Sequence, residues 1–190
     1  ALLRMQLRRL DRVSPEQALR DSISRIMSIA LVHETLSEGQ IGMVDLGRLV
    51  GSISKAADSD QMAKPWITLD ASEHPVMIPS REATSVALVV NELIQNALEH
   101  SLHGEDPGRI SVKIRQLKNM VTVIVQDDGP GFPKDFDPEQ HGNLGLTIVQ
   151  TLVTEELKGI FKIGWDHGAR AELTFPLPQG YHPIKARTDI

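Results

Sequence analysis

One helical segment carries polar side chains at a spacing that could do chemistry. In the apolar stretch that follows Ser80, the residues Glu92, Asn96 and His100 recur every fourth position and so share one helix face. An amide oxygen such as that of Asn96 suits a hard cation such as Mg²⁺. A carboxylate one turn earlier can orient a metal-bound or attacking water. A solvated helix face would show the same pattern, so this segment gains meaning only from its neighbours.

A second candidate site follows a strand predicted to end at Gln126. The strand runs into Asp127-Asp128-Gly129-Pro130-Gly131, which holds a carboxylate at the end of a sheet beside a backbone that a planar ligand can approach closely. The Asp127 carboxylate could accept a hydrogen bond from an exocyclic amine such as N6 of adenine. By itself, this segment is equally an ordinary turn between two elements.

A third segment combines glycines with a helix start. Gly142-Asn143-Leu144-Gly145-Leu146 opens a predicted helix, where exposed N–H groups and the positive end of the helix dipole can hold a phosphate. A glycine pair before a helix is a weak signal alone.

Composition limits the classes of function. The 190 residues include 20 basic and 25 acidic side chains, for a formal net charge of −5, which argues against a nucleic-acid partner. With 0 cysteines the chain has no disulfide, thiolate metal site or cysteine nucleophile. No apolar run approaches the roughly 18 residues that cross a bilayer, so we expect no membrane segment in this chain and a cytoplasmic location. Because Ala1 falls inside a helical pattern, we expect the chain to belong to a longer protein.

The first part of the chain is predicted to be a helical hairpin. Leucines repeat on one side of residues 1–12, and Ser14-Pro15-Glu16-Gln17 is a helix start signal for a second helix that ends near Ser37. That helix carries a heptad-like apolar seam, which Ile23, Ile26 and Ala30 help to form. Two helices bury little surface, so we expect a second copy to complete a four-helix homodimer.

The remainder alternates helices and strands and predicts an α+β fold. Asp45 can cap a third helix, and Ser80 starts a long helix that ends near Ser101. Because strands joined by short loops pair antiparallel, we expect helices layered on one face of a sheet. The expected domains are a hairpin at 1–40, a second domain at 41–178 and a loose tail at 179–190. The predicted strands are 66–69, 76–78, 109–115, 120–126, 160–165 and 169–175, with a further helix at 144–157.

Taken together, the three polar segments resemble a known set of motifs. The Asn-bearing helix, the Asp-x-Gly-x-Gly loop and the Gly-x-x-Gly-Leu helix entry, in this order, resemble the N, G1 and G2 boxes of the Bergerat-fold (GHKL) ATPases, which include histidine kinases, gyrase, Hsp90 and MutL. The resemblance covers Ile41 to about Pro178. It implies a two-layer α/β sandwich, with a mixed sheet covered by helices on one face.

The hairpin narrows the resemblance to sensor histidine kinases. Residues 2–9 and 28–34 resemble the dimerisation hairpin of soluble kinases related to the HWE group, such as the ethanolamine-utilisation sensor and relatives that signal to ANTAR-type regulators. The HWE tryptophan signature is absent near the G1 loop, which favours a neighbouring subgroup. In such kinases the phosphoacceptor histidine lies on the first helix, so it would precede Ala1. His33 is a less favoured acceptor because it falls on the apolar seam.

The resemblance also implies roles for individual residues. Asp127 would bind adenine, Asn96 would hold Mg²⁺ against the phosphates, and Glu92 would be the catalytic acid that orients a water. The other ATP-binding positions shape the adenine pocket, contact phosphate or form the helix entry, and they are His100, Gly129, Gly131, Gly142, Leu144, Gly145 and Leu146. The loop 132–141 would be a lid. Two departures, Glu99 in place of lysine and Ala169 in place of threonine, could weaken nucleotide affinity.

The implied activity is that of a histidine kinase core that uses ATP and Mg²⁺ and passes the phosphoryl group to an aspartate of a response regulator. Two alternatives remain at this stage. One is a gyrase- or Hsp90-like ATPase that drives a clamp, against which the hairpin weighs. The other is a non-catalytic ATP-binding dimer module that regulates a partner by contact.

Overall fold

The computed structural model describes residues 42–58, 66–72, 74–100, 108–132 and 144–177, together with positions 23, 26 and 30. Those three positions are helical, and both Ile23 and Ile26 are exposed. Most of the predicted hairpin, including His33, lies outside the described residues, as do most of the predicted lid and the tail.

A five-stranded sheet with the strand order β2-β4-β5-β7-β6 forms one layer. Its strands are β2 (Trp66–Asp70), β4 (Arg109–Leu117), β5 (Met120–Asp127), β6 (Ile160–Trp165) and β7 (Ala169–Pro176). β2 pairs with β4 in parallel, and every other neighbouring pair is antiparallel. The sheet is therefore mixed, as predicted.

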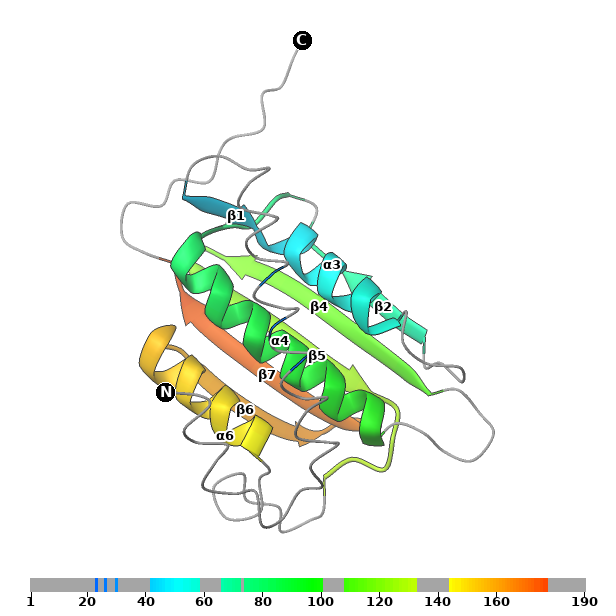
Figure 1. Cartoon of the computed structure of the whole chain (residues 1–190). Coiled ribbons are helices and arrows are strands. Elements are labelled where there is room, and N and C mark those ends of the chain that lie inside the picture. Colours follow the sequence, from blue (N-terminus) through cyan, green and yellow to red (C-terminus); the bar gives the residue numbers. More distant parts are fainter. Residues whose placement is uncertain are drawn as a thin grey trace.

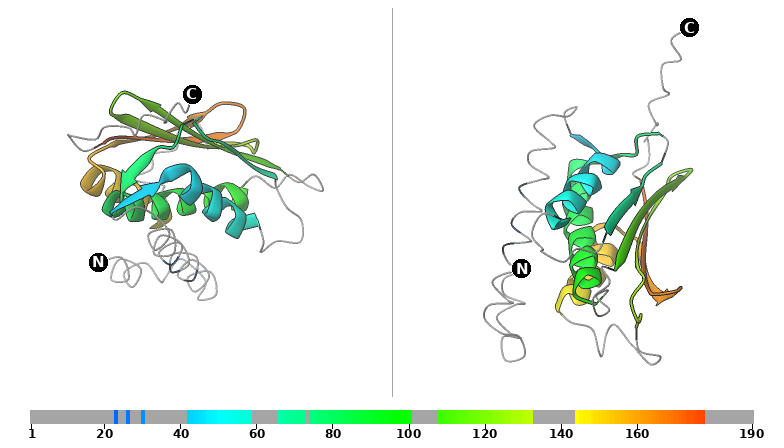
Figure 2. Two further views of the ribbon diagram at one scale, coloured as in Figure 1. Left: turned by 90° about the horizontal axis from the view of Figure 1, so that it is seen from above. Right: turned by 90° about the vertical axis from the view of Figure 1, so that its right-hand side faces the viewer.

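Helices cover one face of this sheet and form the second layer (Figures 1 and 2). They are α3 (Leu46–Asp58), α4 (Ser80–His100) and α6 (Leu144–Thr151), and α4 lies between the other two. The start of α3 confirms the predicted cap, because Asp45 Oδ1 accepts a hydrogen bond from the Gly47 amide at 2.9 Å. The two-layer α/β arrangement expected from the sequence is confirmed. No helix in the described part of the chain is both long and apolar enough to span a membrane.

One local expectation was wrong. β2 and β3 (Met77–Pro79) follow one another closely but do not pair; β3 instead pairs antiparallel with β1 (Met43–Asp45), a short strand that the sequence pattern did not predict. After β3 the chain crosses the sheet through α4 before it enters β4. A helical crossover brings the chain back in its original direction, which is why β2 and β4 are parallel.

The core lies between the two layers. In β5 the alternation is complete, with Val121, Val123 and Val125 buried under the helices and the intervening residues on the outer face. Asp127 continues the buried series at the end of the strand, where it is 6% exposed. The period of the strand alone therefore turns this carboxylate toward the helical layer.

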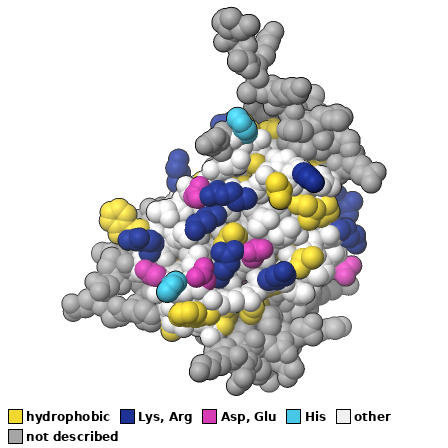
Figure 3. Space-filling view, turned by 180° about the vertical axis from the view of Figure 1, so that it is seen from behind, with side chains coloured by type: hydrophobic (Ala, Val, Ile, Leu, Met, Phe, Trp, Pro, Cys, Tyr) yellow, Lys and Arg dark blue, Asp and Glu magenta, His cyan; other side chains and the backbone are white. Residues whose placement is uncertain are grey.

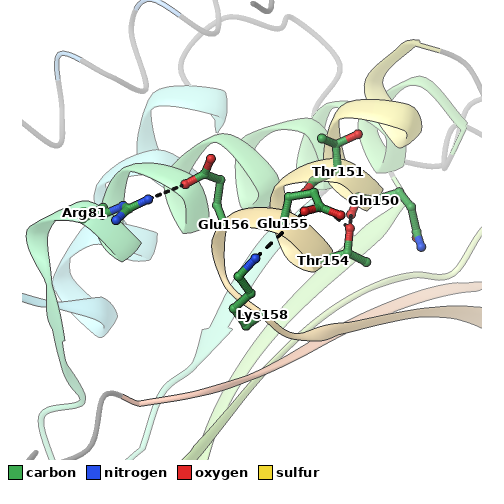
Figure 4. A network of polar contacts seen from close by, with 7 residues as sticks. All are labelled: Arg81, Gln150, Thr151, Thr154, Glu155, Glu156 and Lys158. Atoms are coloured by element: carbon green, nitrogen blue, oxygen red, sulfur yellow. Dashed lines mark hydrogen bonds and ion pairs between the residues drawn. The ribbon is translucent and has the colours of Figure 1, made fainter.

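The predicted helix 144–157 is confirmed, but its last part is wider than an α-helix. Leu152–Glu156 forms a π-helical turn, closed by a hydrogen bond that the Leu157 amide donates to the Leu152 carbonyl at 3.0 Å. The Thr154 hydroxyl donates to the Gln150 carbonyl at 2.9 Å, a type of contact that bends helices. An ion pair of 3.2 Å between Arg81 and Glu156 joins this turn to the start of α4 (Figure 4).

The outer face of the sheet carries charges of both signs (Figure 3). Arg115 of β4 pairs with Asp70 of β2, and Arg170 and Glu172 pair along β7 at 2.6 Å. The Arg115 guanidinium lowers the pKa of Asp70 through their hydrogen bond. This pair joins the edge strand β2 to the rest of the sheet.

We expect Asp70→Asn to lower the thermal midpoint slightly at pH 7. Because the folded-state pKa of Asp70 is depressed, its stabilising effect is complete above the unfolded value near 3.8 and is lost as the pH falls through the folded pKa. The midpoint difference between variant and wild type should thus shrink below that pH, and at high salt. Thermal melts across pH measure it, with Asp166→Asn as the exposed control. If the midpoints of Asp70→Asn and wild type differ by the same amount at every pH, the ion pair of Asp70 with Arg115 is not the source of the stabilisation.

Candidate functional site

The candidate site lies at one end of the two-layer fold, where several elements meet. α4 and β5 run in the same direction and end together at the lower right of Figure 1, close to the turn that joins β6 to β7. α6 packs against α4 and begins at the lower end of the same view. The end of α4, the end of β5 and the start of α6 thus lie at one end of the molecule. These are the elements that carry or border the predicted N, G1 and G2 segments.

Asp127 is held by hydrogen bonds to the backbone. Its Oδ1 atom accepts from the Gly129 amide at 2.8 Å and from the Ala169 amide at 3.0 Å. Oδ2 accepts no hydrogen bond from the described residues. One oxygen therefore fixes the carboxylate, and the other is left to accept a hydrogen bond from a ligand.

The close approach of the β6–β7 turn to Asp127 requires glycine at position 168. Gly168 has a φ of 149°, and a Cβ atom there would lie 1.9 Å from the Asp127 carbonyl oxygen. No side chain fits at that distance. Glycine is thus what allows Ala169 to donate to the carboxylate.

The neighbouring acid, Asp128, has a different role. Its Oδ1 accepts a hydrogen bond from the Arg109 amide at 2.7 Å, and its own amide donates to the Arg109 carbonyl at 3.2 Å. Asp128 thereby extends the pairing of β4 and β5 at an exposed position. Of the two adjacent acids, Asp127 is the buried one, and the alternation of β5 places it on the helix-covered face of the sheet.

The polar residues of α4 are substantially buried. Asn91 and Glu92 are 5% and 8% exposed, and Asn96, one turn after Glu92, is partly buried. No group of three or more His, Asp or Glu side chains in the described ranges is arranged to hold a metal ion. The amide oxygen of Asn96 is a hard ligand of the kind that suits Mg²⁺, provided that a bound nucleotide supplies further oxygens.

The remaining predicted residues are placed to different degrees. Gly131 has a φ of 76° and faces Trp165, while Gly145 and Leu146 are buried in the first turn of α6. Leu144 begins α6 and His100 ends α4, but the structure describes only the backbone of each. Gly142 lies outside the described residues, as does His33.

Some contributors to the site were not predicted from the sequence. The Ala169 amide acts through the backbone, so the side chain at position 169 itself gives no signal for this contact. Trp165 ends β6, is 65% exposed and lies against Gly131. The signal that could have found these contacts is the Asp166-His167-Gly168 turn, which is typical of a tight hairpin.

Comparison with known families agrees with the fold. Residues 82–179 match the model of the histidine kinase-, DNA gyrase B-, and HSP90-like ATPases, and residues 1–59 match a histidine kinase model, HisKA_2. The chain therefore belongs to the histidine kinase-, DNA gyrase B-, and HSP90-like ATPase family, and its N-terminal match places it among the histidine kinases.

Individual relatives point the same way. The chain is 36% identical over 160 residues to the sensor histidine kinase PdtaS of Mycolicibacterium smegmatis, an alignment that covers 84% of this chain and 32% of that protein. It thus spans about a third of the length of this relative. It is 28% identical over 140 residues to blue-light-activated histidine kinase 2 of Erythrobacter litoralis, covering 70% of this chain and 40% of that one.

Solved structures show the same fold. The histidine kinase domain of a blue-light-activated histidine kinase from Erythrobacter litoralis superposes with a TM-score of 0.72 at 25% identity, over 83% of this chain and 75% of that one. The catalytic domain of histidine kinase ThkA superposes with a TM-score of 0.63 at 18% identity, over 73% of this chain and 97% of that one.

Substitution of Gly168 tests the geometry around Asp127. We expect Gly168→Ala to lower the free energy of unfolding by about 2–4 kcal/mol, because the new Cβ must displace the Asp127 backbone. Gly164→Ala on the same hairpin is the matched control, since a Cβ at Gly164 meets no atom within 4 Å. Urea unfolding curves measure both variants. Equal effects of the two substitutions would show that the close approach does not constrain residue 168.

Proposed function

We propose that this chain is the dimerisation and ATP-binding core of a sensor histidine kinase. It binds Mg-ATP and directs the γ-phosphoryl group to a histidine, from which a response-regulator aspartate receives it. The observation that supports this most is the buried Asp127 carboxylate, anchored through Oδ1 and open at Oδ2. Membership of the ATPase family and similarity to sensor histidine kinases support it independently.

Adenine recognition follows from this anchored carboxylate. Oδ2 of Asp127 accepts a hydrogen bond from N6, the exocyclic amine of adenine. Guanine has no amine at the equivalent position. Because Asp127 is buried, this hydrogen bond forms away from competing water, where a charge-assisted contact is strong. Gly129 and Gly131 bring the backbone close to the flat base without a side chain between them.

The phosphate side of the proposed site is built from helices. Asn96 supplies an amide oxygen that would hold Mg²⁺, and the ion would neutralise phosphate charge when bound. Glu92 lies one turn earlier on the same face of α4, where its carboxylate can act on the reacting group. His100, Leu144 and the glycines at 142 and 145 are proposed to complete the phosphate and lid contacts. The amides at the start of α6 can donate to phosphate oxygens.

In the transfer step, the protein mainly positions the reacting groups and neutralises their charge. The neutral imidazole nitrogen of the acceptor attacks the γ-phosphorus in line while the bond to the β-phosphate oxygen breaks, leaving ADP. Glu92 is proposed to orient the nucleophile or accept its proton. We place the acceptor histidine on the helix that would precede this chain, rather than at His33.

The proposed assembly is a homodimer formed through the hairpin at residues 1–40. The exposure of Ile23 and Ile26, 53% and 65%, supports it, because an apolar helical stripe needs a covering partner. A cytoplasmic response regulator is the proposed recipient of the phosphoryl group, and an ANTAR-type regulator is the candidate that the subgroup resemblance favours.

Replacing Asp127 tests nucleotide recognition. Asp127→Asn should weaken Mg-ADP binding by at least tenfold, because it removes the charge-assisted hydrogen bond to N6. Calorimetric titration measures the dissociation constant. Asp128→Asn is the matched control and should bind almost normally, since the asparagine oxygen can still accept from the Arg109 amide. Equal binding by wild type and Asp127→Asn would refute the assignment of the adenine site.

Replacing Glu92 separates binding from transfer. In a chain extended by its native upstream residues, Glu92→Gln should reduce acid-labile label from γ-labelled ATP by about 10²–10⁴-fold. Mg-ADP affinity should change little. Glu82→Gln, in the first turn of the same helix, is the control and should keep its labelling.

Label on the unextended chain would instead make His33 the acceptor. ATP binding without label on either chain would favour a non-catalytic module that regulates a partner by contact.

A further inference from the structure

An exposed tryptophan lies against the candidate site without being part of the core. Trp165 ends β6 and is 65% exposed, yet its ring closely covers Gly131. A Cβ atom built on Gly131 would lie 2.4 Å from Trp165 Cδ1 and 3.1 Å from Nε1. The indole is therefore seated on the backbone of the last glycine of the Asp127 loop.

The same turn holds the other end of this loop. Ala169 donates to Asp127 Oδ1 at 3.0 Å, and the Gly168 backbone is packed against Asp127 and Asp128. The turn itself is braced, because the Asp166 amide donates to the Gly168 carbonyl at 3.0 Å and the Gln126 side chain donates to the Asp166 carbonyl. The loop 127–131 is thus held at its first residue by a hydrogen bond and at its last by an aromatic ring.

The ring has its own support. Its centroid lies 5.5 Å from that of His167 at an interplanar angle of 45°. Such a tilted aromatic pair is favourable and limits the freedom of the indole. Trp165 is therefore placed to act on Gly131 rather than left loose on the surface.

We propose that Trp165 is a positioning residue of the nucleotide site, acting through Gly131. Gly131 has a φ of 76°, and glycine alone populates both signs of φ readily. The indole restricts that freedom, so the loop is closer to its ligand-bound conformation before the nucleotide arrives, and less ordering is needed on binding. This inference rests on the proposed nucleotide-binding function.

Nucleotide affinity tests the proposal on the full 190-residue chain. Trp165→Ala should weaken Mg-ADP binding about three- to tenfold, and Trp165→Phe should restore most of the affinity because a phenyl ring can still cover Gly131. Trp66→Ala is the matched control, since Trp66 is 72% exposed and lies on β2, at the opposite edge of the sheet from β6. Thermal midpoints without nucleotide should be similar for the two alanine variants.

Fluorescence gives a second readout that a merely structural role would not move. The chain has 2 tryptophans, so Trp66→Phe leaves Trp165 as the sole emitter. Its emission should change on addition of Mg-ADP, and half of the change should be reached at the dissociation constant found by calorimetry.

A double-mutant cycle tests the contact without nucleotide. Gly131→Ala should destabilise the wild-type chain more than the chain that already carries Trp165→Ala, because the ring is the nearest obstacle to the new Cβ.

The outcomes separate the two proposals. If Trp165→Ala binds Mg-ADP with wild-type affinity, or if the emission of Trp165 does not change when Mg-ADP binds, the positioning role is overturned. The proposed function would remain intact. Absence of Mg-ADP binding by the wild-type chain would overturn both.

Discussion

The structure of the candidate site depends on a carboxylate oxygen that accepts from two backbone amides. Oδ1 of Asp127 joins the Gly129 amide, which follows it in the chain, to the Ala169 amide at the start of β7. A buried charge is tolerated only when it is well hydrogen-bonded, and these amides provide that without neutralising it. The glycine at 168, the tight β6–β7 turn and the position of Trp165 all follow from the need to bring Ala169 to this oxygen.

Ordinary strand geometry supplies the rest of the placement. Since side chains alternate along β5, the residue that continues the series Val121, Val123, Val125 must face the helices. α4 covers that face, and its C-terminal end lies where β5 ends (Figure 1). A substitution that shifted the register of β5 by one residue would expose Asp127 and bury Asp128. The site is thus specified by the same pattern that specifies the core.

Local signals in the sequence predicted most of these elements, and non-local contacts explain what was missed. The Asp45 cap, the long helix from Ser80 and the alternation of β5 depend on residues close in sequence, so they could be predicted. The pairing of β1 with β3 and the contact of Trp165 with Gly131 join distant segments, and strand β1 is too short to show a period. The structure buries Asp127 and leaves Asp128 exposed, so the strand period indicates the same acid as the motif.

The backbone origin of these contacts also bears on the departure at Ala169. The resemblance led us to expect that alanine in place of threonine could weaken nucleotide affinity. In the structure, residue 169 reaches Asp127 through its N–H group, which every residue except proline supplies. The anchoring of the carboxylate is therefore independent of the side chain at 169, and only a direct contact of a hydroxyl with the ligand would be lost. By the same reasoning, the constraint falls on Gly168, whose missing side chain is what lets the backbone of Ala169 come close enough to donate.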